Sequence, residues 1–185
     1  MANVNMYTAG KKPVVELTGI NNLGTEDIKS VKMATGVTEL MNGMGVVVNE
    51  VTEEASLPID TGAKVWLHAS VEKLYNGEGR NEFSITDTTK GFLARVYRLR
   101  DGQTFETNAC FWDGTTYANL TAVKTAMASA TLYAIPSTSG LWEITATLPT
   151  TVEGTSVAPT IYCTVKAIVT APNNEAVAEL VVKIA

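Results

Sequence analysis

The stretch IYCTVKAIVTAPNNEAVAELVVKIA, residues 161–185, carries the clearest structural signal in the sequence. Apolar side chains stand at every second position in 161–169 and again in 178–184. A period of two predicts strands with one buried face, because successive side chains of a strand point to opposite sides. The turn-forming residues 172–174 separate the two runs. We therefore expect an antiparallel hairpin, with the Cys163 thiol on its buried face.

The same alternation predicts further strands before this hairpin. They cover residues 46–51, 64–71, 91–99, 104–112 and 142–148. Up to residue 113 we expect a meander of about five strands, with a turn at residues 76–79. Asp101-Gly102 predicts that 91–99 and 104–112 form a hairpin, since Asp and Gly are favoured in tight turns.

Composition supports a fold built mainly from strands. The 185 residues include 26 Thr and 20 Val, and β-branched side chains fit pleated sheets better than helices. Two short helices are expected from their caps. One follows Thr25 and ends before Gly36, and the other covers residues 119–130 with Asn119 as its cap. The predicted fold class is all-β: a compact antiparallel β-barrel or sandwich with one or two short helices and an extended N-terminal arm.

Residues 1–44 show no sustained hydrophobic period and are expected to form this arm, with one short helix. Residues 45–185 are expected to form a β-rich domain, divisible into 45–113 and 114–185. An arm of this composition buries little of itself, so it lies on a neighbour or stays mobile. Val14-Val15 is suited to adding a strand to the open sheet edge of a neighbour. The candidate residues for partner contact are Tyr7, Lys11, Lys12, Val14, Val15 and Leu17.

Charge and the counts of metal-binding residues exclude several classes of function. Lys and Arg total 14 against 19 Asp and Glu, a net charge of −5. An acidic chain lacks the basic surface that phosphate binding requires, so no nucleic-acid partner is expected. Two cysteines and one histidine are too few for a Cys/His zinc site, and no metal or cofactor is expected. The absence of a signal-peptide pattern and of a long apolar run predicts a protein made in the cytoplasm without a membrane partner.

One short motif suggests catalysis. Asp60-Thr61-Gly62 resembles the active-site loop of aspartic proteases, in which two carboxylates share a proton. A single copy would act only in a dimer, so a homodimeric aspartic protease using Asp60 is the alternative of an enzyme class. A turn between two strands is the favoured interpretation, because Pro58 interrupts the strand that such a loop requires. His68 is expected to be a half-exposed strand residue rather than a general base. We therefore expect no catalytic residue and no enzyme activity.

The aromatic residues of strand 104–112 allow two interpretations. If the strand is regular, Phe105, Thr107, Ala109 and Phe111 face the core and Trp112 faces the opposite side. An exposed Trp112, or Trp66 beside His68, would be suited to anchoring a partner protein. Alternatively, these tryptophans fill a second packed layer.

Three blocks, residues 63–75, 91–98 and 101–108, resemble structural proteins of tailed bacteriophages. The likeness is strongest to the capsid decoration, or cement, proteins. It implies a non-enzymatic virion protein that binds the outer surface of a phage capsid and stabilises it. The implied partners are the major capsid protein and neighbouring copies on the capsid lattice. A phage tail-tube or fibre component is the alternative role within the virion.

Overall fold

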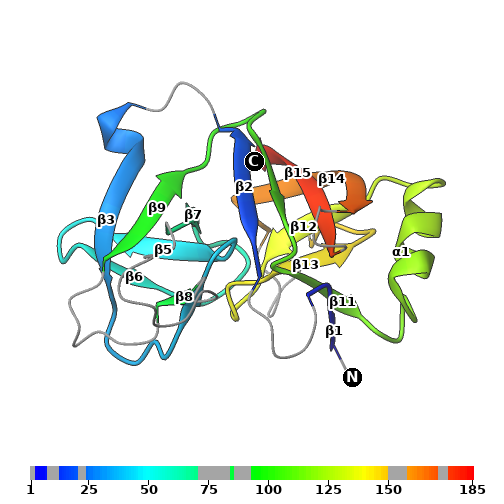
Figure 1. Cartoon of the computed structure of the whole chain (residues 1–185), viewed down its shortest axis with the longest axis horizontal. Helices are drawn as coiled ribbons and strands as arrows, with labels where there is room; N and C mark the ends of the chain where they lie inside the picture. Colours follow the sequence, from blue (N-terminus) through cyan, green and yellow to red (C-terminus); the bar gives the residue numbers. More distant parts are fainter. Residues whose placement is uncertain are drawn as a thin grey trace.

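The computed structural model describes residues 3–7, 13–20, 24–70, 84–85, 93–149, 158–170 and 175–185. The prediction of an all-β fold is confirmed. The described strands form a closed five-stranded barrel, an eight-stranded sheet and a small two-stranded sheet. Figure 1 shows the barrel on one side, the larger sheet on the other, and a short helix at the outer end of the sheet.

The barrel unit consists of five short strands. In ring order they are β3 (Ile28–Met33), β6 (Glu54–Ser56), β5 (Gly45–Asn49), β7 (Trp66–His68) and β9 (Ala94–Arg98). Among these five strands, only β3 and β6 pair in parallel. The pair β4 (Leu40–Met41) and β8 (Ser84–Ile85) forms the two-stranded sheet. Inside the barrel, the buried aliphatic residues include Val31, Val46 and Val96.

The sheet unit contains the predicted hairpin. Its strand order is β1 (Asn3–Asn5), β11 (Cys110–Asp113), β13 (Trp142–Thr145), β12 (Tyr133–Pro136), β14 (Ile161–Thr170), β15 (Ala176–Ile184), β10 (Thr104–Thr107) and β2 (Val15–Gly19). β14 and β15 pair antiparallel as expected, and Cys163 is fully buried. Only two residues separate β10 from β11, although they stand near opposite ends of the order. The sheet therefore curls until both ends meet the same stretch of chain.

The second predicted helix is confirmed and the first is wrong. Helix α1 (Leu120–Met127) begins after Asn119, whose Oδ1 accepts a hydrogen bond from the Ala122 amide at 3.0 Å. Residues 25–36 instead form a single 3-10 turn, η1 (Thr25–Asp27), followed by strand β3. Pairing of β3 with β9 and β6 buries Val31 and Met33, and this tertiary gain outweighs the local helix signals.

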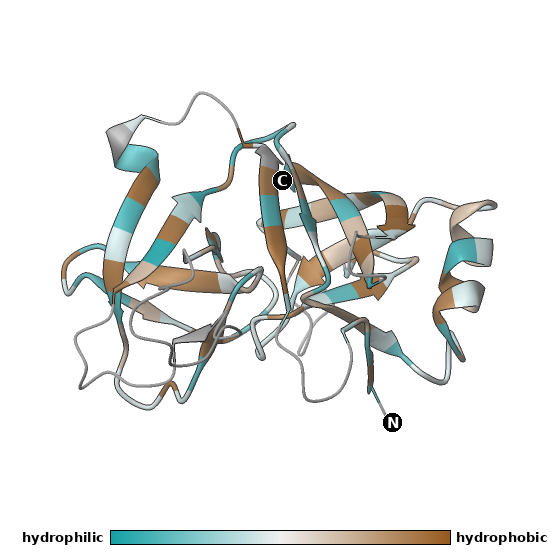
Figure 2. Cartoon of the chain, in the orientation of Figure 1, coloured by the Kyte–Doolittle hydropathy of each residue, from teal (hydrophilic) through white to brown (hydrophobic). Residues whose placement is uncertain are grey.

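Apart from η1, the residues expected to form an N-terminal arm are strands wherever the structure describes them in regular elements. β1 and β2 are the outermost strands of the sheet unit, and β3 belongs to the barrel. Figure 2 shows apolar and polar residues alternating along β2 and β3. The larger of the two hydrophobic clusters, which we call the main core, contains Phe105, Trp142 and Leu180. Val15 and Leu17 pack against it on one face of β2. This segment of the chain therefore contributes to both units instead of standing apart from them.

The predicted hairpin of 91–99 with 104–112 is wrong. β9 belongs to the barrel and β10 to the sheet, so the Asp101-Gly102 turn carries the chain from one unit to the other. Gly102 has φ +79°, and its amide donates to the Val182 carbonyl at 2.9 Å. The turn prediction holds, but the strands on either side find partners elsewhere. The predicted turns at 76–79 and 172–174 lie outside the described residues.

The regular strand predicted for 104–112 is broken at Asn108-Ala109. Phe105 and Trp112 consequently belong to the main core, whereas Phe111 packs with the barrel residues. Trp112 and Trp66 are 2% and 4% exposed, so the second-layer interpretation of the tryptophans is confirmed. Because side chains of each unit enter the core of the other, the two units share a continuous apolar contact.

Candidate interaction surfaces

The single histidine is sealed inside the protein. His68 is 0% exposed, which corrects the expectation of a half-exposed residue. Its Nδ1 lies 2.8 Å from the Met41 carbonyl oxygen, and its Nε2 lies 2.8 Å from Ser70 Oγ. A carbonyl oxygen only accepts, so Nδ1 carries the proton and Nε2 accepts from the Ser70 hydroxyl. Burial lowers the pKa of His68 to about 4, which keeps the imidazole neutral at ordinary pH.

This imidazole belongs to a network that holds residues 41–44 against β7. Asn42 and Ser70 exchange two hydrogen bonds, of 3.0 and 2.8 Å, through the Asn42 amide group and the Ser70 backbone. Ser70 Oγ also accepts from the Arg95 amide at 3.0 Å. A serine hydroxyl on an imidazole is the contact that nucleophilic enzymes use. Here both groups are occupied in joining β4, β7 and β9.

Neither thiol is placed for metal binding or redox chemistry. Cys110 and Cys163 are free and fully buried, and burial raises the pKa of both thiols far above the usual range. Among the residues that the structure describes, no three His, Cys, Asp or Glu side chains gather in a way that could hold a metal ion.

The loop containing Asp60 connects β6 to β7, as the turn interpretation predicts. Pro58 is buried, whereas Ile59 is 86% exposed. The Ala63 amide closes the turn on the Asp60 carbonyl at 3.5 Å. Thr160 Oγ1, just before β14, donates to the Gly62 carbonyl at 2.6 Å. The sheet unit therefore braces this barrel loop.

A groove of about 640 Å³ lies between this loop and the barrel strands. We call it the barrel groove. Its apolar lining consists of Val47, Val48, Leu57, Ile59, Ala63 and Trp66. Its charged lining consists of Glu50, Asp60, Lys64 and Arg98. A groove lined by both apolar and charged side chains is typical of sites that bind other molecules.

The charges beside Trp66 largely satisfy one another. The Arg98 guanidinium lies 4.8 Å and the Lys29 ammonium 5.5 Å from the centroid of the Trp66 ring, as in cation–π contacts. Both cations contact Glu50 Oε1, at 3.1 and 3.3 Å. Hydrogen bonding and attraction from Lys29, with a smaller effect of Arg98, lower the pKa of the Glu50 carboxyl. This end of the groove is thus fixed before any partner arrives.

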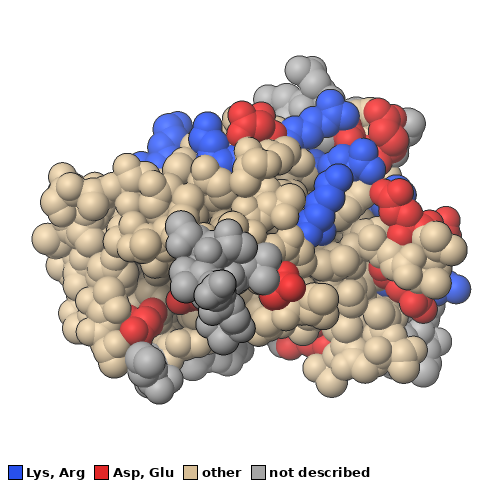
Figure 3. Space-filling view, turned by 180° about the vertical axis from the view of Figure 1, so that it is seen from behind, with Lys and Arg blue, Asp and Glu red and all other residues tan. Residues whose placement is uncertain are grey.

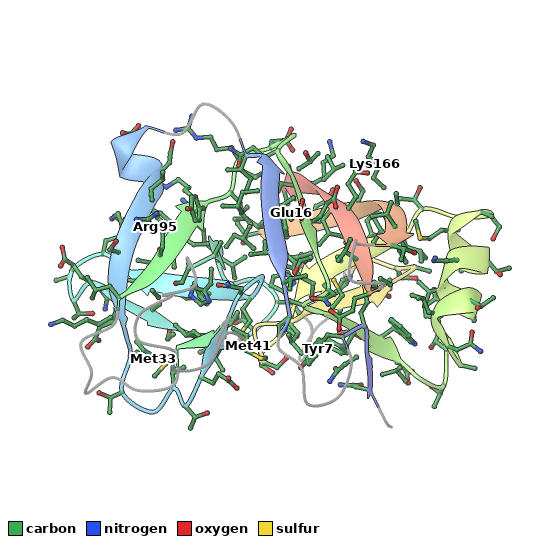
Figure 4. The ribbon with its side chains drawn as sticks, viewed as in Figure 1. Tyr7, Glu16, Met33, Met41, Arg95 and Lys166 are labelled. Atoms are coloured by element: carbon green, nitrogen blue, oxygen red, sulfur yellow. The ribbon has the colours of Figure 1, made fainter. Side chains whose placement is uncertain are left out.

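Most of the predicted contact residues pack against the chain itself. Val15 and Leu17 lie against the main core, and Tyr7 lies against the barrel core. The labelled Tyr7 stands between the two units in Figure 4. The Val14 amide donates to Asn108 Oδ1 at 2.7 Å. Lys11 and Lys12 lie outside the described residues. β2 therefore adds a strand to the chain's own sheet, at its edge.

A second surface surrounds helix α1 and carries almost no charge. We call it the α1 face and define it as the exposed residues of 115–131. They are Thr115, Thr116, Ala118, Asn119, Thr121, Lys124, Thr125, Ala128, Ser129, Ala130 and Thr131. Only Lys124 among them is charged. Figure 3 shows wide uncharged areas on the half of the molecule that carries α1, seen from behind. Low charge in this stretch is visible in the sequence, but its clustering beside one helix is not.

The barrel groove was not predictable from sequence, because its lining comes from β5, the β6–β7 loop, β7 and β9. No helix in the described part of the chain is both long and apolar enough to cross a membrane. No protein-family model matches the chain, and no curated protein or solved structure matches it either.

Proposed function

We propose that this protein is a non-enzymatic structural protein of a tailed-phage virion that binds the outer surface of the capsid and stabilises it. The resemblance of residues 63–75, 91–98 and 101–108 to capsid decoration proteins suggests the class. The α1 face is the observation that carries the proposal, because it suits the chain to docking on a protein shell.

The composition of the α1 face lowers the cost of docking. Thr, Ser and Ala lose little side-chain entropy when they are buried, in contrast to Lys and Glu. Burying them also avoids the desolvation of charge. One weak contact of this kind becomes strong in effect when it is repeated over a symmetric lattice and coupled to neighbouring copies. The major capsid protein is therefore the proposed partner of this face.

The test is co-sedimentation of the purified full chain with empty capsids of tailed phages. We expect saturation at a fixed ratio of this chain to coat subunits. The informative variant is Thr121→Glu, which places a carboxylate in the first turn of α1. Negative charge is favourable there for the helix, so folding is retained. Burying that charge against the shell is unfavourable, and we expect binding to weaken roughly tenfold or more.

The matched control is Thr35→Glu, because Thr35 is exposed in the turn after β3, in the barrel unit. It adds the same charge away from the α1 face, so its binding should equal that of the wild type. Failure of the wild type to bind capsids would refute the proposal. If Thr121→Glu bound capsids as well as the wild type, the α1 face would not be the capsid-binding surface. Assembly of the isolated chain into tubes would favour the tail component instead.

A further inference from the structure

The rim of the barrel groove carries an aliphatic side chain with nothing to cover it. Ile59 is 86% exposed although it lines the groove. Its loop is held by the turn hydrogen bond of Ala63 and by the contact of Thr160 with Gly62. A fixed, exposed aliphatic side chain loses little freedom when a partner covers it, and such side chains anchor protein interfaces.

Two opposite charges line the same groove as this side chain. Asp60 and Lys64 both line the groove. Neither forms an ion pair with any residue that the structure describes. This contrasts with Glu50 and Arg98 in the same groove, which are paired with each other. The groove therefore offers one carboxylate and one ammonium that have no ion-pair partner in the described part of the chain, four residues apart.

We propose that the barrel groove binds the barrel groove of a second copy of this chain, with the two copies related by a two-fold axis. In such an interface, the Ile59 side chain of each copy enters the groove of the other. The Asp60 carboxylate of each copy meets the Lys64 ammonium of its partner copy. A two-fold axis brings each pair together twice, since residue i contacts j and j contacts i.

The complementarity of the groove to itself is what favours a second copy over another partner. Each contact needs two complementary groups, and the surface carries both of them. Ile59 is complementary to the groove, and the Asp60 carboxylate is complementary to the Lys64 ammonium. A partner of uniformly positive or negative charge would place a like charge against Lys64 or Asp60, which is unfavourable. The inference concerns this chain alone and does not depend on capsid binding.

The first test is sedimentation equilibrium of the full chain. We expect a dimer whose dissociation constant rises roughly tenfold or more in Ile59→Asp. The matched control is Val51→Asp, because Val51 is 93% exposed but does not line the groove. It should change the dissociation constant by less than about twofold. Both positions are exposed, so circular dichroism should show unchanged folding.

The second test reverses the charges. Asp60→Lys and Lys64→Asp each place like charges together at two symmetric points, so each should weaken the dimer by about fivefold or more. The double variant restores opposite pairing and should return to within about threefold of the wild type. Such rescue is not expected if either residue acts through folding alone.

Three results would overturn the inference. They are a wild type that stays monomeric up to about 1 mM, an Ile59→Asp variant that dimerises like the wild type, and a double charge variant that remains as weak as the single ones. A chain that dimerises but ignores capsids would refute the proposed function and leave this inference standing. A monomer that decorates capsids would do the reverse.

Discussion

The barrel unit and the sheet unit are both all-β, yet their interiors differ in chemistry. The barrel strands are three to six residues long, and their surroundings include the buried polar side chains of Asn42 and His68. The sheet contains β14 and β15, which are ten and nine residues long. Its centre holds Trp142, Cys163 and Leu180, all fully buried.

Strand length accounts for this difference. A buried backbone group needs a hydrogen-bond partner, and a long ladder supplies one at nearly every residue. Short strands leave more backbone outside the ladders. In the barrel, His68 Nδ1 donates to the Met41 carbonyl and Asn42 donates to the Ser70 carbonyl. Polar side chains thus supply hydrogen-bond partners for backbone groups that the short ladders leave unpaired.

The sheet unit obeys the same rule at the point where its own ladder breaks. Between β10 and β11, the Val14 amide donates to Asn108 Oδ1 at 2.7 Å. Thr107 Oγ1 donates to the Val14 carbonyl at 2.7 Å and accepts from the Ala109 amide at 3.0 Å. In both units, these buried polar side chains thus make hydrogen bonds to backbone groups where the strand pairing is interrupted.

The outer surfaces differ in the opposite sense. Residues 24–70, mostly of the barrel unit, include ten charged side chains, whereas residues 114–165 include three. The barrel unit thus combines a charged outer surface with a mainly aliphatic core that contains a few buried polar side chains. The sheet unit combines a mainly apolar interior with an α1 face whose one charged side chain is Lys124. We expect the two units to contribute to stability and binding in different ways.

The largest effect is expected at the joint between the units, from Trp142→Ala. Trp142 is fully buried, packs on Phe105 with ring centroids 5.7 Å apart, and donates to the Gly43 carbonyl at 2.8 Å. Its removal leaves a large cavity and should lower the free energy of unfolding by about 3–5 kcal/mol. Because both units share this residue, urea unfolding should remain a single transition.

Trp142→Phe is the control for that variant, since it keeps an aromatic ring and loses mainly the N–H. Trp142→Phe should lower the free energy of unfolding clearly less than Trp142→Ala does. Amide hydrogen exchange reports each unit separately. If Trp142→Ala accelerates exchange in the sheet strands alone and leaves the barrel strands protected, the units are independent and the shared core has no energetic importance.

The next effect concerns the polar interior of the barrel. The folded protein holds the pKa of His68 at about 4, against 6.5 for the free side chain. On acidification the unfolded chain therefore takes up a proton before the folded protein does. The contribution of neutral His68 to the free energy of unfolding is therefore complete above pH 6.5, and it is lost as the pH falls toward 4. The loss should reach about 3 kcal/mol in the free energy of unfolding.

Urea titrations between pH 7 and pH 4 measure this loss. His68→Gln can still donate to the Met41 carbonyl and accept from Ser70, but it does not titrate. Its unfolding free energy should change much less over the same range. A wild type and a variant with the same pH dependence would show that another group is responsible.

The smallest effect is expected at the helix of the sheet unit. Asn119→Ala removes the side chain that accepts from the Ala122 amide, so it should cost about 1 kcal/mol in the free energy of unfolding. Asn119→Asp keeps a carboxylate oxygen in the same place and should be nearly neutral. Thermal unfolding of the three proteins measures the difference. Equal destabilisation by both substitutions would indicate that the cap is not what holds α1.

Local patterns were sufficient for several elements. The period of two in 161–169 and 178–184 predicted the β14–β15 hairpin and the burial of Cys163, because the two strands are close neighbours in the sequence. Asn119 predicted the start of α1, since a cap acts on amides three residues away. The scarcity of charged residues in 115–131, which form the α1 face, can also be seen in the sequence. The barrel groove was not, because four separate segments line it.

The sequence by itself therefore determined that the chain is all-β, which face of each long strand is buried, and where the Asp101-Gly102 turn and the start of α1 lie. These properties depend on neighbouring residues. Apart from the β14–β15 hairpin, only the tertiary structure decided which strands pair: β9 and β10 flank a predicted turn but join different sheets, and residues 28–33 pair with β9 and β6 instead of continuing a helix. The physical reason is that strand pairing joins residues distant in the chain, so its free energy depends on which partners the whole fold brings together.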